Sequence, residues 1–180
     1  MSPSSDKTMK TITHLLSVIM IALLLAAGLA ACSPGTSTPP PVPPTDLEQP
    51  ARQVLENFLV SLHLGRYEEA YHFFGGSYEM MIAQNPLIDP QDHATLLQNA
   101  CTTNGFLCLQ WQSIELEQTI SETEFVFTVQ FQQSDGSLFV LGPCCGATET
   151  EFPPLSSFSF RVSPGPDGTL LVMDMVPYMP

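Results

Sequence analysis

Basic residues are scarce in this sequence. Lysine and arginine together number 5 among 180 residues, against 18 aspartates and glutamates. Both lysines, Lys7 and Lys10, lie in the first ten residues, so the chain after residue 31 has only arginine to offset its acids and carries a formal charge of about −14. A domain this acidic repels nucleic acid and anionic lipid surfaces, so we expect no nucleic-acid partner. Solubility is the simplest role for the charge.

Long apolar runs and sequence motifs for catalysis are also missing. The one extended apolar stretch, Leu15 to Leu29, has about fifteen residues, whereas a membrane-spanning helix needs about 20. No nucleophile elbow, phosphate loop, calcium loop or closely spaced pair of metal ligands occurs. We therefore expect no bound metal and no cofactor.

Residues 1–31 read as an export signal. A polar start with two lysines precedes the short apolar run, which ends in small residues. The segment Leu29-Ala30-Ala31-Cys32 resembles the lipobox of bacterial lipoproteins. That resemblance implies transfer of diacylglycerol to the Cys32 sulfur, cleavage before Cys32 and acylation of the new amine. We expect an exported protein that lipid on Cys32 anchors to the bacterial cell membrane or outer membrane. An ordinary signal peptide or a transmembrane anchor is the alternative.

Residues 32–49 form a tether after the lipid cysteine. The tract holds six prolines among serines and threonines, a composition that favours extended polyproline geometry at about 3 Å per residue. Residues 50–180 remain for one folded domain, long enough for a core of its own. Ser33 follows the lipid cysteine where an aspartate would favour retention at the inner membrane, so sorting to the outer membrane is favoured in an organism with two membranes.

Four further cysteines belong to this domain: Cys101, Cys108, Cys144 and Cys145. An even number of cysteines in an exported domain predicts disulfides. Adjacent cysteines bond to each other only through a strained ring, so we expect Cys144 and Cys145 to bond separately to Cys101 and Cys108. Which pairs with which stays open. A zinc site and a redox-active vicinal pair are the alternatives, although the six-residue spacing departs from zinc-site patterns.

Hydrophobic periodicity predicts helices first and strands afterwards. An apolar stripe at three- and four-residue spacing predicts a helix from Ala51 to Leu62, followed by a second helix over 66–74 and a third starting at Asp89-Pro90. Alternation over Phe125 to Phe131 predicts a strand, and a turn at 134–137 predicts a hairpin with 138–141. Further strands are expected over 109–117, 156–162 and 169–176. The predicted fold class is α+β, with helices packed on one face of an antiparallel sheet.

The first two helices carry a family resemblance. After the opening helix and Gly65, the segment Arg66-Tyr67-Glu68-Glu69-Ala70-Tyr71 is similar to the start of NTF2-like domains of the cystatin-like superfamily. The resemblance covers residues 50–176 and implies a cone, in which a curved sheet wraps around helices and leaves a pocket at one end. Some relatives, such as ketosteroid isomerases and scytalone dehydratases, place Asp, Tyr or His in that pocket for proton transfer.

Candidate site residues are few. Asp174 lies between two methionines of the last predicted strand, and there it is either a base in apolar surroundings or an ordinary solvated residue. Tyr67, Tyr71 and Tyr78 either line the cone pocket or belong to the core. We expect no catalytic role for His63, His72 or His93. Methionines 173, 175 and 179 suggest strand packing rather than a copper site, and glutamates 115, 117, 122 and 124 suggest a solvated sheet edge.

These features support one main hypothesis and two alternatives. The main hypothesis is a non-catalytic envelope domain that binds a partner protein or a small apolar ligand. The first alternative is an isomerase- or dehydratase-like enzyme with Asp174 as its base. The second is a structural module that forms a homodimer through the open face of the sheet.

Overall fold

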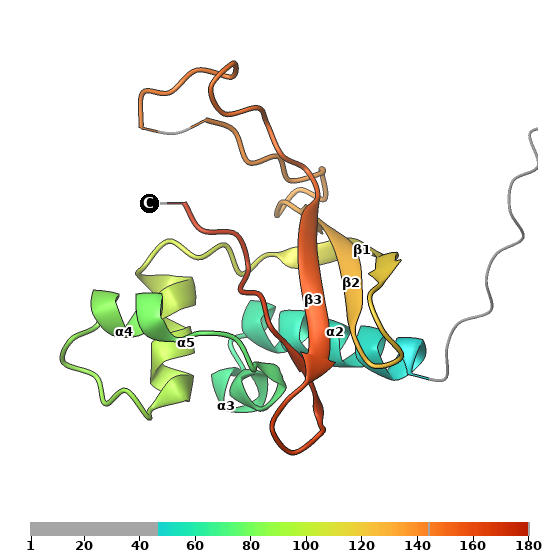
Figure 1. Ribbon diagram of the computed structural model, residues 1–180. Helices are drawn as coiled ribbons and strands as arrows, with labels where there is room; N and C mark the ends of the chain where they lie inside the picture. The colour runs from blue at the N-terminus through green and yellow to red at the C-terminus, as the bar shows by residue number, and fades with distance from the viewer. Residues whose placement is uncertain (1–46, 144, 180) are drawn as a thin grey trace, which may run out of the picture. The chain divides into compact units, whose positions relative to one another are not determined.

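The computed structural model describes residues 47–143 and 145–179, and in this part of the chain helices precede strands (Figure 1). The predicted α+β class is confirmed. The predicted signal segment, Cys32, almost all of the tether, and Cys144 lie outside the described residues. The elements are α2 (Glu48–His63), α3 (Tyr67–Ala70), the 3-10 helix η2 (Tyr71–Phe73), α4 (Glu79–Gln84), α5 (His93–Thr102), β1 (Gln110–Thr119), β2 (Phe125–Gln132), β3 (Phe158–Pro164) and β4 (Leu170–Val172).

The four strands form one curved antiparallel sheet in the order β1-β2-β3-β4 (Figure 1). The alternation predicted for β2 decides which face turns inward, since Phe125, Phe127, Val129 and Phe131 are all fully buried. Phe160 of β3 lies opposite Phe127 and extends the same apolar face. The inner face is therefore a phenylalanine-rich surface that needs a covering helix.

Helix α2 supplies that cover. Its apolar stripe, including Leu55, Phe58 and Leu62, is buried, and the helix contacts all four strands. Arg52 adds a polar link, because its guanidinium lies 5.4 Å from the centre of the Phe127 ring and Nη1 donates to the carbonyl of Ile114. None of the helices in the described ranges is long and apolar enough to cross a membrane.

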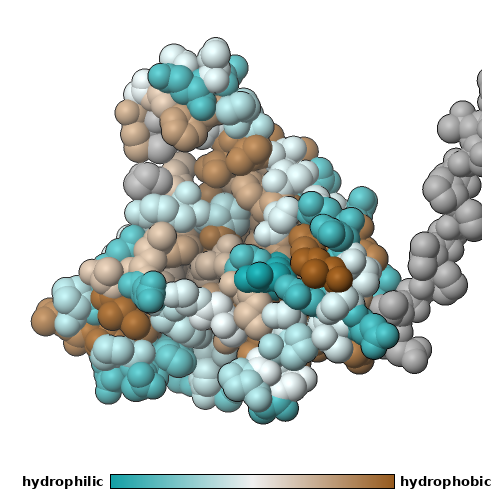
Figure 2. Space-filling model, in the orientation of Figure 1, coloured by the Kyte–Doolittle hydropathy of each residue, from teal (hydrophilic) through white to brown (hydrophobic). Residues whose placement is uncertain are grey.

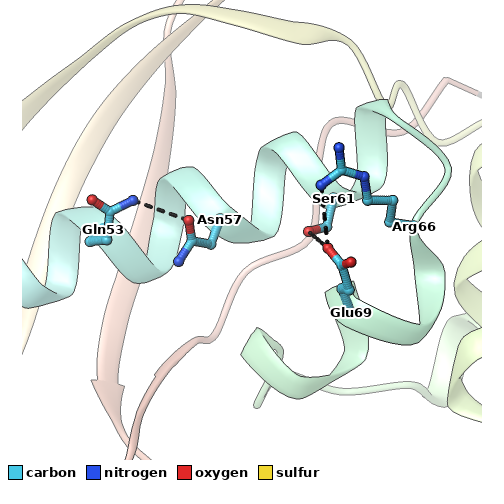
Figure 3. Close-up of polar contacts among 5 residues, drawn as sticks. All are labelled: Gln53, Asn57, Ser61, Arg66 and Glu69. Atoms are coloured by element: carbon cyan, nitrogen blue, oxygen red, sulfur yellow. Dashed lines mark hydrogen bonds and ion pairs between the residues drawn. The ribbon is translucent and has the colours of Figure 1, made fainter.

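A tight turn joins α2 to α3 (Figure 3). Gly65 has a φ of +69°, a backbone conformation that residues with a Cβ rarely adopt. The Arg66 amide then donates to the Ser61 carbonyl at 2.8 Å. Glu69 then accepts from the hydroxyl of buried Ser61 at 3.5 Å and pairs with the Arg66 guanidinium at 3.6 Å. The glycine that separates the two predicted helices thus reverses the chain over a small polar cluster.

The helices after this turn differ in detail from the prediction. The second predicted helix divides into α3 and η2, and α4 was not predicted. The third helix begins after Asp92 rather than at Asp89-Pro90, because the Asp92 side chain accepts from the Thr95 amide at 3.1 Å. Asp89 instead accepts from the Gln91 amide at 2.9 Å and stabilises the turn before the helix.

Only the first residues after the turn form the hairpin predicted after β2. Residues 132 and 138 form one isolated bridge, and the chain then leaves the sheet as an extension over residues 133–157, which we call the arm (orange in Figure 1). Leu141 and Leu155 hold the two sides of the arm together by reciprocal backbone hydrogen bonds of 2.8 and 2.9 Å. Pairing with β2 continues as far as Phe139, whose amide donates to the Phe131 carbonyl at 2.8 Å, but a full strand over 138–141 does not form because Leu141 pairs within the arm.

The disulfide pairing corrects the expectation from sequence. Cys101 of α5 bonds to Cys108, with Cα atoms 5.5 Å apart, so neither is joined to Cys144 or Cys145. The chain reverses between them at Gly105, where φ is +86° and a Cβ would meet the Met179 carbonyl oxygen. This close approach brings Cys108 back beside the end of α5. Such a reversal depends on packing against the C-terminal segment and leaves no trace in cysteine spacing.

Removing this bridge is expected to destabilise the domain moderately. The double variant Cys101→Ala/Cys108→Ala should lower the free energy of unfolding by at most about 2.5 kcal/mol, because the bridge closes a loop of only about eight residues. Urea unfolding with and without reductant measures the effect. The wild-type chain should fall to the level of the double variant on reduction; a wild type unchanged by reductant would contradict the assigned bridge.

Candidate functional site

Asp174 lies just beyond β4 and is half-buried. Its Oδ2 accepts the backbone N–H of Arg161 at 2.7 Å, and the neighbouring Met173 amide donates to the Arg161 carbonyl at 2.8 Å. The carboxylate therefore takes the place of a strand partner for β3. Asp174 borders none of the hollows described below, and the contact that the geometry shows for its carboxylate is this pairing with the backbone of β3.

Two of the three predicted pocket tyrosines come together around His93. The Tyr78 ring stacks on the His93 ring with centroids 4.1 Å apart, and Tyr71 approaches the same ring at 6.3 Å. Burial, reinforced by nearby Tyr71, raises the pKa of the Tyr78 hydroxyl well above its usual range, so the hydroxyl stays protonated. It finds no hydrogen-bond partner within the described residues. The cluster packs against the core through Phe74 at 5.1 Å from Tyr78, whereas Tyr67 lies apart from it on α3.

His72 extends this cluster, because its ring lies tilted against that of Tyr71 with centroids 4.0 Å apart. His63 lies elsewhere, at the end of α2, with Nδ1 3.2 Å from the Cys108 carbonyl. Across residues 47–143 and 145–179, no group of three or more His, Cys, Asp or Glu residues is placed to hold a metal ion. Two of the C-terminal methionines lie in separate places as well: Met175 lines a hollow beside α4, and Met179 lines a different one under the arm. Two tyrosines and two histidines singled out from sequence therefore share one aromatic cluster, and the other candidates are not part of it.

A hollow lies between the arm and the C-terminal segment. Its volume is about 370 Å³, within the range of about 300–1,000 Å³ that is usual for small-molecule sites. Leu141, Phe152 and Leu155 of the arm face Tyr178 and Met179, and none of the described residues that line the hollow is acidic or basic. We call this space the arm hollow. Its apolar, uncharged lining stands out in a chain with a formal charge of −13.

No match for this chain emerges from comparisons with protein-family models, curated proteins and solved structures.

Both walls of the arm hollow are held in place by contacts outside it. The C-terminal wall is fixed because Met179 N–H donates to the Gly105 carbonyl at 3.0 Å and the Tyr178 ring packs on Phe106 at 5.1 Å. At the far end of the arm, Thr148 donates its amide and hydroxyl to Glu151 at 2.9 and 3.0 Å, which lowers the pKa of that carboxyl below its usual range. These contacts position the apolar residues between them.

The arm also exposes apolar side chains around the hollow. Phe152 is 65 % exposed and Leu155 52 % exposed, and Val140 and Leu138 are exposed on the same segment. Figure 2 shows apolar residues gathered at the base of the arm. Exposure of several large apolar side chains on one segment is typical of a binding surface rather than of a solvated loop.

Sequence reasoning missed this site. No helix or strand was predicted between residues 141 and 156, and the phenylalanine and leucine that flank Pro153 and Pro154 have no periodic pattern. The wall contributed by Tyr178 and Met179 comes from the other end of the domain. No local signal in the sequence joins these two segments.

Proposed function

We propose that this chain is an exported bacterial lipoprotein whose NTF2-like domain binds a small uncharged apolar molecule in the arm hollow. The lipid on Cys32 holds the protein on the cell membrane or outer membrane, and residues 32–49 keep the domain away from the lipid surface. The observation that carries the binding role is an apolar, charge-free hollow of about 370 Å³ within a strongly acidic domain.

Two structural features support the anchoring and the family. Disulfides persist in oxidising compartments, so the Cys101–Cys108 bond supports export. The order of helices and strands and the curved antiparallel sheet with α2 on its inner face support the NTF2-like resemblance. The hollow has room for a small molecule rather than a folded partner, which favours the ligand over a partner protein.

The two alternative functions have less support. Proton transfer needs a base in a pocket, whereas the Asp174 carboxylate is bound to the Arg161 backbone. Dimerisation through the sheet needs an apolar outer face. Instead, Glu117 accepts hydrogen bonds from the hydroxyls of Thr128 at 3.0 Å and Ser159 at 2.8 Å across that face. The outer face is therefore polar, and these polar groups already bind one another.

A fluorescent apolar probe tests the binding role. The chain from residue 32 onward, with Cys32→Ser to remove the lipid site, should raise the fluorescence of uncharged N-phenyl-1-naphthylamine in a saturable way. Phe152→Glu places a carboxylate against the hollow and should weaken binding at least about tenfold, because the apolar lining cannot solvate the charge.

Leu87→Glu is the matched control, since Leu87 is 99 % exposed and lies outside the arm hollow. It should bind the probe as the parent does. An equal loss in both variants, or no saturable signal in the parent, would contradict the proposal. If the natural ligand is a protein instead, the part of a cell-envelope extract that a 10 kDa filter retains should inhibit probe binding. The 10 kDa limit is about half the mass of this 19.6 kDa chain, so small molecules pass the filter and folded proteins of similar size do not.

A further inference from the structure

A second groove differs chemically from the arm hollow: glutamine side chains dominate its polar lining, and it borders Trp111, the only tryptophan of the chain. One hollow of about 480 Å³ and another of about 430 Å³ share His63, Gln110 and Gln132 as lining residues. They therefore form one continuous depression where α2 ends, β1 begins and β2 ends. We call it the glutamine groove, and its lining is distinct from that of the arm hollow.

Strand pairing concentrates amide side chains in this groove. Gln110 lies opposite Gln132 in the β1–β2 register, and the adjoining residues Gln112 and Gln133 also line the depression. A register shift between Trp111 and Ser113 leaves Gln112 as the additional residue of β1. Irregularities of this kind redirect side chains and are frequent beside binding sites.

The four amides are available to a ligand. No hydrogen bond joins the Gln110, Gln112, Gln132 or Gln133 side chain to another residue in the part of the chain that the structure describes. Each amide offers one acceptor oxygen and two N–H donors, so the groove presents both kinds of partner along its length. Half-buried Trp111 adds an aromatic surface next to them.

The absence of charge narrows the class of ligand. Among the described residues, no Asp, Glu, Lys or Arg lines either hollow, and His63 is the one basic side chain there, although the chain has 18 acidic residues. A cation would require carboxylates, and an anion would require basic groups. A peptide added as a strand would need an uninterrupted edge, but β1 has register shifts at two points along its length.

We propose that the glutamine groove binds an uncharged oligosaccharide. Sugar hydroxyls donate and accept hydrogen bonds, as the free amides do, and the C–H face of a sugar ring packs on an indole. The two hollows, of about 480 and 430 Å³, have room for more than one linked sugar unit. This proposal concerns a different surface from the arm hollow, so either one can fail without the other.

Trp111 makes the test direct, because the sole tryptophan of the chain reports on the groove by its own fluorescence. The full chain in an uncharged polyoxyethylene detergent is titrated with maltohexaose and with chitohexaose, two uncharged oligosaccharides without and with acetamido groups. At least one should change the Trp111 emission in a saturable way. Gln110→Ala/Gln132→Ala should raise the Kd at least about tenfold, since two amides are lost from the shared centre of the groove.

Gln118→Ala is the matched control: Gln118 is an exposed glutamine of β1 that lines neither hollow. Its Kd should stay within about twofold of the wild type. Thermal unfolding checks that each variant is folded, and if the double variant is not, Gln112→Ala replaces it with the same expected direction. Phe152→Glu should leave sugar binding unchanged.

Several results would overturn the proposal. They are no saturable response to either oligosaccharide up to about 10 mM, an equal loss in Gln118→Ala, or saturation by an uncharged Ser/Gly decapeptide in place of the sugars. Protection of Trp111 from acrylamide quenching by the bound sugar is the second, independent readout. It should disappear in parallel with the emission change.

Discussion

Cys32→Ala is expected to abolish lipid attachment completely and to leave the chain at its precursor length. In the lipoprotein pattern that this sequence resembles, the sulfur of Cys32 is the atom that accepts diacylglycerol. Cleavage before residue 32 follows that transfer. Stable anchoring requires more than one acyl chain, because a single chain binds membranes only marginally. Growth with labelled palmitate, followed by electrophoresis, measures incorporation and size together.

The matched control for this experiment is Cys145→Ala, which removes an exposed cysteine of the arm. It should incorporate label as the wild type does and show the same size shift when signal-peptide cleavage is inhibited with globomycin. Label that persists in Cys32→Ala would refute the lipid site. A mature-sized, unlabelled wild-type chain would instead identify an ordinary signal peptide.

Phe58→Ala is expected to lower the free energy of unfolding by about 3–5 kcal/mol, the usual cost of removing a buried phenylalanine ring. Phe58 has no exposed surface and stacks on Phe74 with ring centroids 5.4 Å apart. It belongs to the α2 face that contacts all four strands, so the resulting cavity lies at the centre of the domain. Because small domains are stable by only about 5–15 kcal/mol, the loss is a large part of the total.

Urea denaturation followed by circular dichroism measures this effect. Val60→Ala, on the same helix but 36 % exposed, is the matched control and should cost less than about 1 kcal/mol. An equal cost for both variants would mean that α2 does not bury its predicted face against the sheet. A negligible cost for Phe58→Ala would contradict the packing of the core.

The elements that sequence predicted well have a local cause. In α2, the spacing of Leu55, Phe58 and Leu62 places one stripe on one side of a helix, whatever the partner is. In β2, alternation of phenylalanines with polar residues requires one face to be buried. Gly65 marks the turn between helices because glycine, which has no Cβ, adopts the left-handed conformation at little cost.

Local sequence patterns did not predict which residues come together in a site. Sequence singled out Asp174 as a candidate base and three tyrosines as pocket-lining or core residues. In the structure Asp174 binds the Arg161 backbone and the tyrosines pack against the core. The glutamines at 110, 112, 132 and 133 were visible as two clusters in the sequence. Their meaning depended on the register that sets Gln110 opposite Gln132.

The sequence by itself determined the α+β class, the apolar faces of α2 and β2, and the acidic character of the domain, because each follows from composition or from a short periodic pattern. Only the tertiary structure decided that Cys101 pairs with Cys108, that residues 133–157 leave the sheet as an arm, and that the arm meets Tyr178 and Met179 around an apolar hollow. These features join segments that are distant in sequence or depend on a chain reversal. Their partners are selected by packing of the whole domain, which no local pattern encodes.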